Sequence, residues 1–143
     1  MPVIISRSEK QTKKLGAKLA GKIMKNAGKP QIVFLIGELG SGKTAFSKGF
    51  AEHLGIKRVS SPTFNIVKSY KIKKGDYTRL VHADLYRVKD LKELENISFF
   101  KDLSKKGIIT LIEWPETVTR KISGIKVRFA HGGNENERLI KIS

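Results

Sequence analysis

Two stretches of the chain are almost wholly apolar, and each has the length of a strand. Residues 31–36 read Gln-Ile-Val-Phe-Leu-Ile, and residues 107–112 read Gly-Ile-Ile-Thr-Leu-Ile. Continuous apolar runs of this length are typical of strands that are buried on both faces of a parallel sheet. We therefore expect both segments to be central strands.

Two other segments have the apolar spacing and the end signals of helices. Ser8 is a good N-cap residue, and the helix predicted after it covers residues 9–26. A second helix is predicted over residues 43–54, where Gly55 ends it. The buried stripe of the first helix is formed by residues four positions apart, namely Leu15, Leu19 and Ile23.

The remaining pattern is that of antiparallel strands and short turns. Residues 63–72 alternate apolar and polar positions, and after a turn at 73–76 residues 77–83 are expected to pair back on them. Because helices gather early and antiparallel strands late, the sheet is predicted to be mixed. The other expected elements are strands near 3–5, 125–130 and 137–142, the last two joined through 131–134, and short helical turns at 90–105.

A phosphate-binding loop lies between the first central strand and the second helix. Residues 37–44 form a complete G-x-x-x-x-G-K-[ST] motif, whose backbone N–H groups point at one phosphate. Lys43 is expected to contact the outer phosphates, and the Thr44 hydroxyl is placed to bind Mg²⁺. The nucleotide-binding residues predicted in this loop are Gly37, Leu39, Gly40, Ser41, Gly42, Lys43 and Thr44.

The order of strand, loop and helix also points the positive end of the helix dipole at the bound anion. We therefore predict one α/β domain over residues 1–143, a P-loop NTPase-like three-layer domain with a mixed parallel/antiparallel central sheet. The guanine-reading motif Asn-Lys-x-Asp is absent from the sequence, so ATP or ADP is the expected nucleotide.

Two acidic residues come directly after apolar strands. Asp84 follows residues 79–83, and Glu113 follows the second central strand. Ligands of open α/β sheets bind at such strand ends, and a phosphate loop needs an acid to complete its magnesium site. Two acids suggest divided labour, in which one holds Mg²⁺ through its water shell and the other orients or deprotonates a water. The alternative for either acid is a helix cap or a surface salt bridge.

Other residues have two interpretations each. Thr63, on a loop stiffened by Pro62, is a candidate switch residue that senses the γ-phosphate or its magnesium, or it belongs to a turn that enters a strand. Trp114, the only tryptophan, either packs in the core or covers the nucleotide pocket. The histidines lack metal-ligand spacing and are interpreted as structural: His53, His82 and His131.

Composition and charge narrow the class of protein. There is no cysteine among the 143 residues, so disulfides and cysteine nucleophiles are excluded. No stretch approaches the ~20 apolar residues of a membrane span, and a cytoplasmic protein is expected. The net charge is +16, from 29 Lys and Arg against 13 Asp and Glu. It indicates either attraction to an acidic partner such as RNA or a lysine-rich surface without such a role.

Four motifs with a fixed order and spacing cover residues 37–116. They are Gly37–Thr44, Ser61-Pro62-Thr63-Phe64, His82-Ala83-Asp84-Leu85-Tyr86-Arg87 and Ile112-Glu113-Trp114-Pro115-Glu116. Together they resemble the TsaE (YjeE) family, small bacterial ATPases of tRNA threonylcarbamoyladenosine synthesis. The departures include Ser41 for an alanine of the loop and Ala83 for a phenylalanine between His82 and Asp84.

The resemblance implies a function and a set of partners. Family members bind ATP and Mg²⁺ and hydrolyse ATP slowly on their own. They act with TsaB and TsaD, of which TsaD transfers the threonylcarbamoyl group to adenosine 37 of ANN-decoding tRNAs. By position, the family's roles fall on Thr44 and Glu113 as metal ligands, on Asp84 and Thr63 in hydrolysis, and on Thr12 and Trp114 beside the nucleotide.

Two other classes of function stay open. A stand-alone small-molecule kinase would transfer phosphate to an acceptor, although the sequence has no Arg-rich lid segment. A nucleotide-gated RNA-binding module would explain the basic charge, with tRNA bound directly or through the complex.

Overall fold

The structure is a computed structural model, and it describes residues 3–58, 67–86, 88, 99–114 and 122–143. None of the helices in these ranges is long and apolar enough to cross a membrane.

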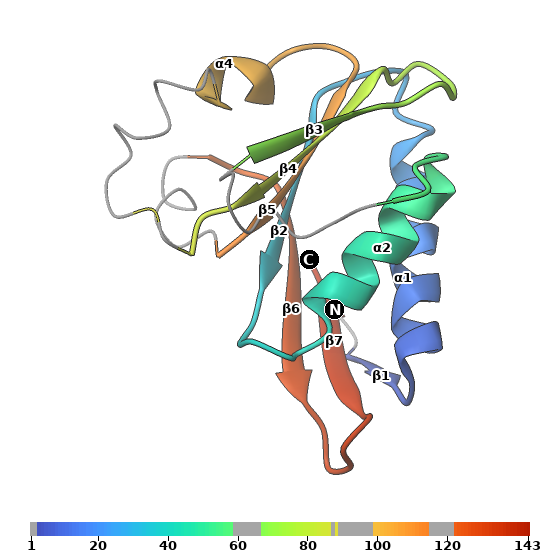
Figure 1. The fold of residues 1–143 in the computed structure, drawn as a ribbon, viewed down its shortest axis with the longest axis vertical. Helices are drawn as coiled ribbons and strands as arrows, with labels where there is room; N and C mark the ends of the chain where they lie inside the picture. The colour runs from blue at the N-terminus through green and yellow to red at the C-terminus, as the bar shows by residue number, and fades with distance from the viewer. Residues whose placement is uncertain (1–2, 59–66, 87, 89–98, 115–121) are drawn as a thin grey trace.

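The described part of the chain forms a seven-stranded sheet in the order β1-β7-β6-β2-β5-β4-β3 (Figure 1). β2 lies between β5 and β6 and pairs parallel with both, and β4 pairs parallel with β5. The edges are antiparallel, since β3 pairs with β4, and β7 pairs with both β6 and β1. The sheet is therefore mixed, as predicted. The strands are β1 Ile4–Ser6, β2 Gln31–Ile36, β3 Val67–Lys71, β4 Arg79–Asp84, β5 Ile108–Glu113, β6 Ile125–His131 and β7 Arg138–Ile142.

Helices cover both faces of this sheet. Helices α1 (Glu9–Ile23) and α2 (Lys43–His53) lie on one face, and the short helix α4 (Phe99–Leu103) lies on the other (Figure 1). Alternate residues of β2 enter two different cores, because successive side chains of a strand point to opposite faces. Val33 packs with the α1–α2 side, and Phe34 packs with the α4 side. The apolar run of β2 is thus explained by burial in both layers.

The contact between α1 and α2 is unusually close. A Cβ atom on Gly16 of α1 would lie 2.1 Å from the carbonyl oxygen of Phe46, and one on Gly49 of α2 would lie 1.9 Å from the carbonyl oxygen of Lys13. Both values are far below any real contact, so each helix needs a glycine where it crosses the other. This crossing fixes α2, and hence the phosphate loop that precedes it, against the rest of the molecule.

Some predicted boundaries were wrong. The first helix ends at Ile23 rather than at residue 26, because Ala27 and Gly28 have φ of 53° and 78° and turn the chain away. β4 begins at Arg79 rather than at residue 77, since the Tyr77 side chain is buried and its hydroxyl donates to the Lys29 carbonyl at 2.8 Å. The predicted strand residues 63–66 and most of the predicted turns at 90–105 lie outside the described residues.

Candidate functional site

The glycines of the phosphate loop adopt the backbone shape that the motif requires. Gly40 and Gly42 have φ of 74° and 108°, a region that side chains disfavour. At Gly37 a Cβ atom would lie 2.7 Å from the Ser41 hydroxyl and 2.8 Å from the Phe129 carbonyl oxygen. The loop is therefore packed against β6, and its path leads directly into the first turn of α2.

Both predicted acids lie at the same edge of the sheet as the loop. Asp84 and Glu113 end β4 and β5 and are paired in register, and Glu113 is aligned with Leu35 of β2. Since the three strands are parallel, their carboxyl ends and the loop after β2 are neighbours. The order of strands thus brings together residues that are far apart along the chain.

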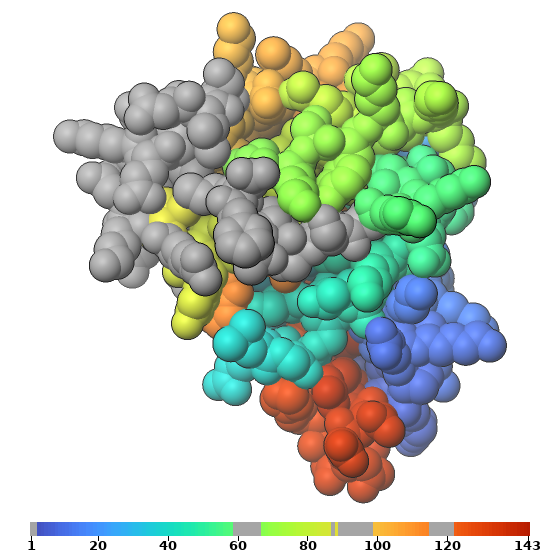
Figure 2. All heavy atoms as spheres, in the orientation of Figure 1, coloured from blue at the N-terminus to red at the C-terminus, as the bar shows by residue number. Residues whose placement is uncertain are grey.

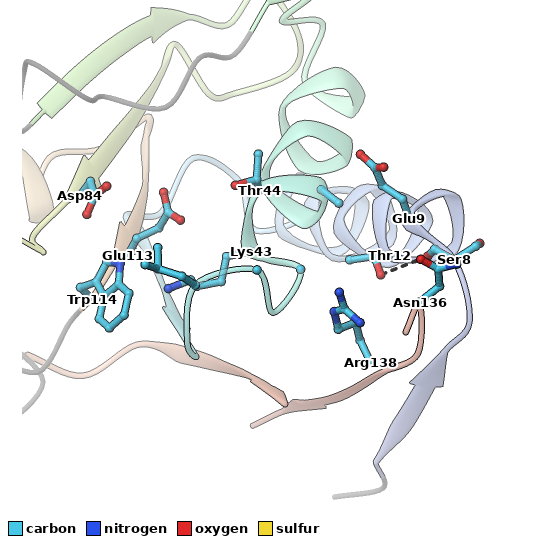
Figure 3. A pocket seen from close by; sticks show the side chains of 14 residues that line it. Ser8, Glu9, Thr12, Lys43, Thr44, Asp84, Glu113, Trp114, Asn136 and Arg138 are labelled. Carbon is cyan, nitrogen blue, oxygen red and sulfur yellow. Dashed lines mark hydrogen bonds between the residues drawn. The ribbon is translucent and has the colours of Figure 1, made fainter. Parts of the chain in front are cut away.

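A cavity of about 330 Å³ lies between these elements (Figure 3). Nine predicted site residues line it, whereas Gly37 and Ser41 do not, and Thr63 falls outside the described residues. In Figure 3, Asp84, Glu113 and Trp114 lie at one end of the cavity, and Ser8, Thr12 and Arg138 lie at the other. The predicted lining residues are Thr12, Leu39, Gly40, Gly42, Lys43, Thr44, Asp84, Glu113 and Trp114; the unpredicted ones are Ser8, Glu9, Ala45, Asn136 and Arg138.

Lys43 is held by the loop and by Trp114. Its Nζ donates to the Gly37 carbonyl at 2.5 Å and lies 3.8 Å from the centroid of the Trp114 ring. Trp114 has a φ of 57°, which is rare for a bulky side chain, and its ring lies 4.9 Å from that of Tyr86. Such strain is tolerated where the surroundings fix it, and it clusters at functional sites. The tryptophan therefore belongs to the cavity rather than to the core alone.

Glu113 has a partner that the sequence interpretation did not anticipate. His82 Nε2 lies 2.8 Å from Glu113 Oε2, and both side chains are buried. Because an ionised carboxylate only accepts, Nε2 carries the donated proton in that state. His82 Nδ1 is also buried and has no hydrogen-bond partner among the described residues. His82 precedes Asp84 by two residues on β4, so both side chains are on one face of the strand, and this spacing was the available signal.

Asp84 is more accessible than Glu113. Its Oδ1 accepts a hydrogen bond from the backbone N–H of Tyr86 at 3.1 Å. Partial burial raises the pKa of its carboxyl group, and the neighbouring Glu113 carboxylate raises it further, while the Tyr86 N–H and the side chains of His82 and Lys43 act against the shift. The two acids thus differ in environment, because a histidine holds Glu113 and a backbone N–H holds Asp84 at the cavity.

The far end of the cavity is built by the two ends of the chain. The Thr12 hydroxyl lies 2.7 Å from the Ser6 hydroxyl, and Ser8 caps α1 by accepting from the Gln11 N–H at 3.1 Å. Arg138 of β7 is held by the carbonyl oxygens of Glu135 and Glu137, at 2.7 and 2.9 Å. No local pattern marks Arg138 in the sequence, since only the pairing of β7 with β6 and β1 places it here.

The donors around the loop suit a magnesium ion. The atoms that could coordinate the ion are all oxygens. They are the hydroxyl of the exposed Thr44 at the start of α2 and the carboxylates of Glu113 and Asp84 across the cavity. No group of three or more His, Cys, Asp or Glu that could hold a metal occurs among the described residues. Mg²⁺ does not need such a group, because it keeps several waters and uses one or two carboxylates together with substrate phosphates.

A phosphate loop between a buried strand and a helix, with acids at the ends of adjacent parallel strands, defines a protein of the P-loop NTPase class. The crystal structure of YdiB from Bacillus subtilis has this fold, with a TM-score of 0.72, 29% identity and coverage of 99% of this chain and 83% of that chain. The family model described as Threonylcarbamoyl adenosine biosynthesis protein TsaE matches residues 6–140. The chain therefore belongs to the TsaE family.

Relatives from Rickettsia felis and Borreliella burgdorferi carry the name tRNA threonylcarbamoyladenosine biosynthesis protein TsaE. The one from Rickettsia felis is 36% identical over 144 aligned positions, which cover 98% of this chain and 78% of the relative. The one from Borreliella burgdorferi is 43% identical over 88 residues, which cover 60% of this chain and 61% of the relative. The second match therefore spans less than two thirds of the relative's length.

Proposed function

We propose that this protein is a Mg²⁺-dependent ATPase that binds ATP and ADP at the phosphate loop and hydrolyses ATP slowly on its own. We further propose that it acts with TsaB and TsaD to form threonylcarbamoyladenosine at adenosine 37 of ANN-decoding tRNAs, as its family membership suggests. The observation that carries the ATPase proposal is that two strand-end acids face the loop's Lys43 and Thr44 across one cavity.

The loop and its lysine would hold the phosphates. The backbone N–H groups between Gly37 and Thr44 supply donors without side chains, and the N-terminus of α2 adds its dipole. Lys43 would exchange the Gly37 carbonyl for a phosphate oxygen, which removes one cation–carbonyl contact and makes a cation–anion contact. Binding of this kind needs no large change in the sheet.

Thr44 and Glu113 would hold the magnesium ion, which neutralises charge on the phosphates when bound. Glu113 suits this role because His82 fixes its carboxylate. Asp84 suits the orientation of a water, because its carboxylate lines the cavity and, among the described residues, is held by one backbone N–H. Phosphoryl transfer depends chiefly on such positioning and on charge stabilisation.

The test of this assignment is Asp84→Asn, which keeps the size of the side chain and removes its charge. We expect ATP turnover to fall by about 100-fold or more, since a positioned acid–base group contributes roughly 10²–10⁴-fold. ADP affinity, measured by calorimetry, should change by less than about threefold, because Asp84 is not placed on the phosphates. Asp76→Asn, in the exposed turn before β4, is the matched control. Wild-type turnover in the Asp84 variant would show that the role is misassigned.

The partners are tested by measuring turnover alone and then with cognate TsaB, TsaD and tRNA. We expect a slow basal rate that rises in the mixture, together with tRNA modification that requires this chain. A rate that the partners leave unchanged would argue against the proposed complex and would favour the small-molecule kinase alternative.

A further inference from the structure

A second hollow lies at the other end of the parallel strands from the phosphate loop, where β4 and β5 begin. Its volume is about 510 Å³, and five of the eight described residues that line it are cationic. We call these five the basic hollow: Lys71, Lys73, Arg79, Lys105 and Lys106. The other lining residues are Ile72, Thr78 and Ile108.

The basic hollow is built from three separate segments. It collects the end of β3, the start of β4 and the connection between α4 and β5, which meet because β3 pairs with β4 and β4 pairs with β5. In Figure 2 the β3–β4 turn and the segment after α4 lie side by side at the top of the molecule. Arg79 and Asp84 are the two ends of β4, so about 16 Å of strand separates the hollow from the nucleotide cavity.

The cations of the hollow outnumber the acids that contact them. Arg79 Nη2 lies 2.9 Å from Asp102 Oδ2, and Lys105 Nζ lies 3.4 Å from Asp102 Oδ1. No other carboxylate within the described ranges forms an ion pair with the hollow's cations. The four lysines are exposed, and holding them together costs energy through mutual repulsion. A bound polyanion would relieve that repulsion.

The side chains of the hollow suit phosphates better than they suit a protein surface. Its two described apolar lining residues, Ile72 and Ile108, are both buried beneath it, and none of the lining residues in the described ranges is aromatic. Protein interfaces have an apolar core enriched in aromatic residues, which this surface lacks. Flexible lysines contact repeating phosphates as point charges without reading bases.

We propose that the basic hollow binds the sugar–phosphate backbone of RNA. The choice of tRNA as that RNA rests on the proposed function, whereas the backbone contact does not. The two sites lie at opposite ends of the parallel strands, so a nucleotide and an RNA could be bound at the same time. Binding of this kind would be strongly salt-dependent and insensitive to the nucleotide.

The test compares two triple variants of equal charge in the full-length protein. The hollow variant lacks three exposed cations of the basic hollow and carries Lys71→Gln, Lys73→Gln and Lys106→Gln. The α1 variant lacks three exposed cations of α1 and the turn after it and carries Lys14→Gln, Lys18→Gln and Lys25→Gln. Affinity for a fluorescein-labelled, unmodified ANN-decoding tRNA transcript is measured by anisotropy in EDTA over a series of salt concentrations. Basal ATP turnover of each variant is measured separately with Mg²⁺.

We expect the hollow variant to lose about tenfold or more in tRNA affinity, and its log–log salt slope to fall by about 2 or more. The α1 variant should lose at most about threefold, because long-range charge alone is screened. Both should keep wild-type basal turnover, so failure of this proposal is separable from failure of the ATPase proposal.

Three results would overturn the proposal. Equal losses in the two variants would show that total charge, not the hollow, attracts RNA. Absence of measurable tRNA binding by the wild-type protein would show that tRNA is not a ligand of the basic hollow. Unchanged tRNA affinity with lost binding to TsaB and TsaD would identify the hollow as a surface for an acidic protein.

Discussion

Glu113 is held by a histidine side chain from the neighbouring strand. A single 2.8 Å contact in a buried setting fixes the carboxylate before any ligand arrives. Fixed acids bind a metal with less reorganisation than mobile ones, and residues behind the ligands tune metal affinity in many proteins. We therefore propose that His82 is a positioning residue that acts through Glu113, since it contacts that carboxylate and does not line the nucleotide cavity.

Substitution of His82 tests this role. His82→Ala should lower ADP affinity about tenfold in the presence of Mg²⁺, because outer partners of a ligand typically contribute that much to metal affinity. Affinity in EDTA should stay near the wild-type value, since His82 does not line the nucleotide cavity. Calorimetry under the two conditions separates these effects, and His82→Gln, which keeps a donor, should recover part of the loss. Equal weakening with and without Mg²⁺ would mean that His82 only supports the fold.

The residues at the site differ in how far the sequence could predict them. Asp84 and Glu113 were predicted because each directly follows an apolar strand, and strand ends carry ligands in this class of fold. His82 was not, because a lone histidine inside an apolar strand looks like packing. No sequence pattern predicted Arg138 at the cavity, since its position there depends on the pairing of β7 with β6 and β1. Long-range pairing leaves no mark on local residue order.

The crossing of α1 and α2 fixes the helix that follows the phosphate loop. Gly16 and Gly49 allow the two backbones to approach, and a Cβ atom at either position would meet backbone atoms that cannot move aside. Glycine normally weakens a helix by ~1 kcal/mol relative to alanine, so these two are retained against helix propensity. Close packing explains them.

Two alanine substitutions within α1 separate packing from propensity. Gly16→Ala should lower the free energy of unfolding by about 2 kcal/mol or more, since the overlap forces the helices apart. Gly21→Ala should be neutral or stabilising by up to about 1 kcal/mol, because the nearest described atoms to its Cβ belong to the His53 side chain, at 3.3 Å, and not to the backbone. Urea denaturation measures both. A harmless Gly16→Ala would contradict the close crossing.

Among the helices and strands, the predicted bounds were correct where burial alone determines the type of element. Residues 31–36 became β2 with the expected bounds, because a six-residue apolar run can be buried on both faces only at the centre of a sheet. The end of α1 was placed too late, since Lys25 and Asn26 are compatible with a helix and only the positive φ of the next residue stops it. The segment 63–66 was not tested, as it lies outside the described residues.

Across the molecule, three connections are tied together at the edge that carries the strand starts. The Tyr77 hydroxyl donates to the Lys29 carbonyl at 2.8 Å, Gly107 N–H donates to the Gly28 carbonyl at 2.7 Å, and Thr78 N–H donates to the Gly107 carbonyl at 2.8 Å. The connections after α1, before β4 and before β5 therefore support one another, and Tyr77 is the buried side chain at their centre.

Tyr77 also makes stability depend on pH in a defined direction. Burial raises the pKa of its hydroxyl above the ordinary value of 10.0. The folded protein thus keeps this proton at pH values where the unfolded chain has lost it, so the group's contribution is complete below pH 10 and is lost as pH rises through the folded pKa. The same group has no effect of this kind at neutral pH.

Comparison with Tyr77→Phe isolates that contribution from the titration of the lysines, which both proteins share. Near pH 7.5 the variant should be less stable by about 1 kcal/mol, the value of one buried hydrogen bond. Above about pH 10.5 the difference should shrink. Only the wild-type protein has a phenol at this position, and its burial disfavours the ionised form that the unfolded chain adopts at that pH. Denaturant unfolding at the two pH values gives both differences. A difference that grows with pH would reverse the assigned direction.

Trp114 gives the protein a built-in optical signal. It is the only tryptophan in the chain, and its ring lies against the Lys43 ammonium, which is the group expected to move onto a phosphate. A charge beside an indole changes the wavelength and yield of its emission, so any event that draws Lys43 away is recorded without a label. Each turnover could then be followed as light from one residue, at the place where the chemistry is proposed to occur.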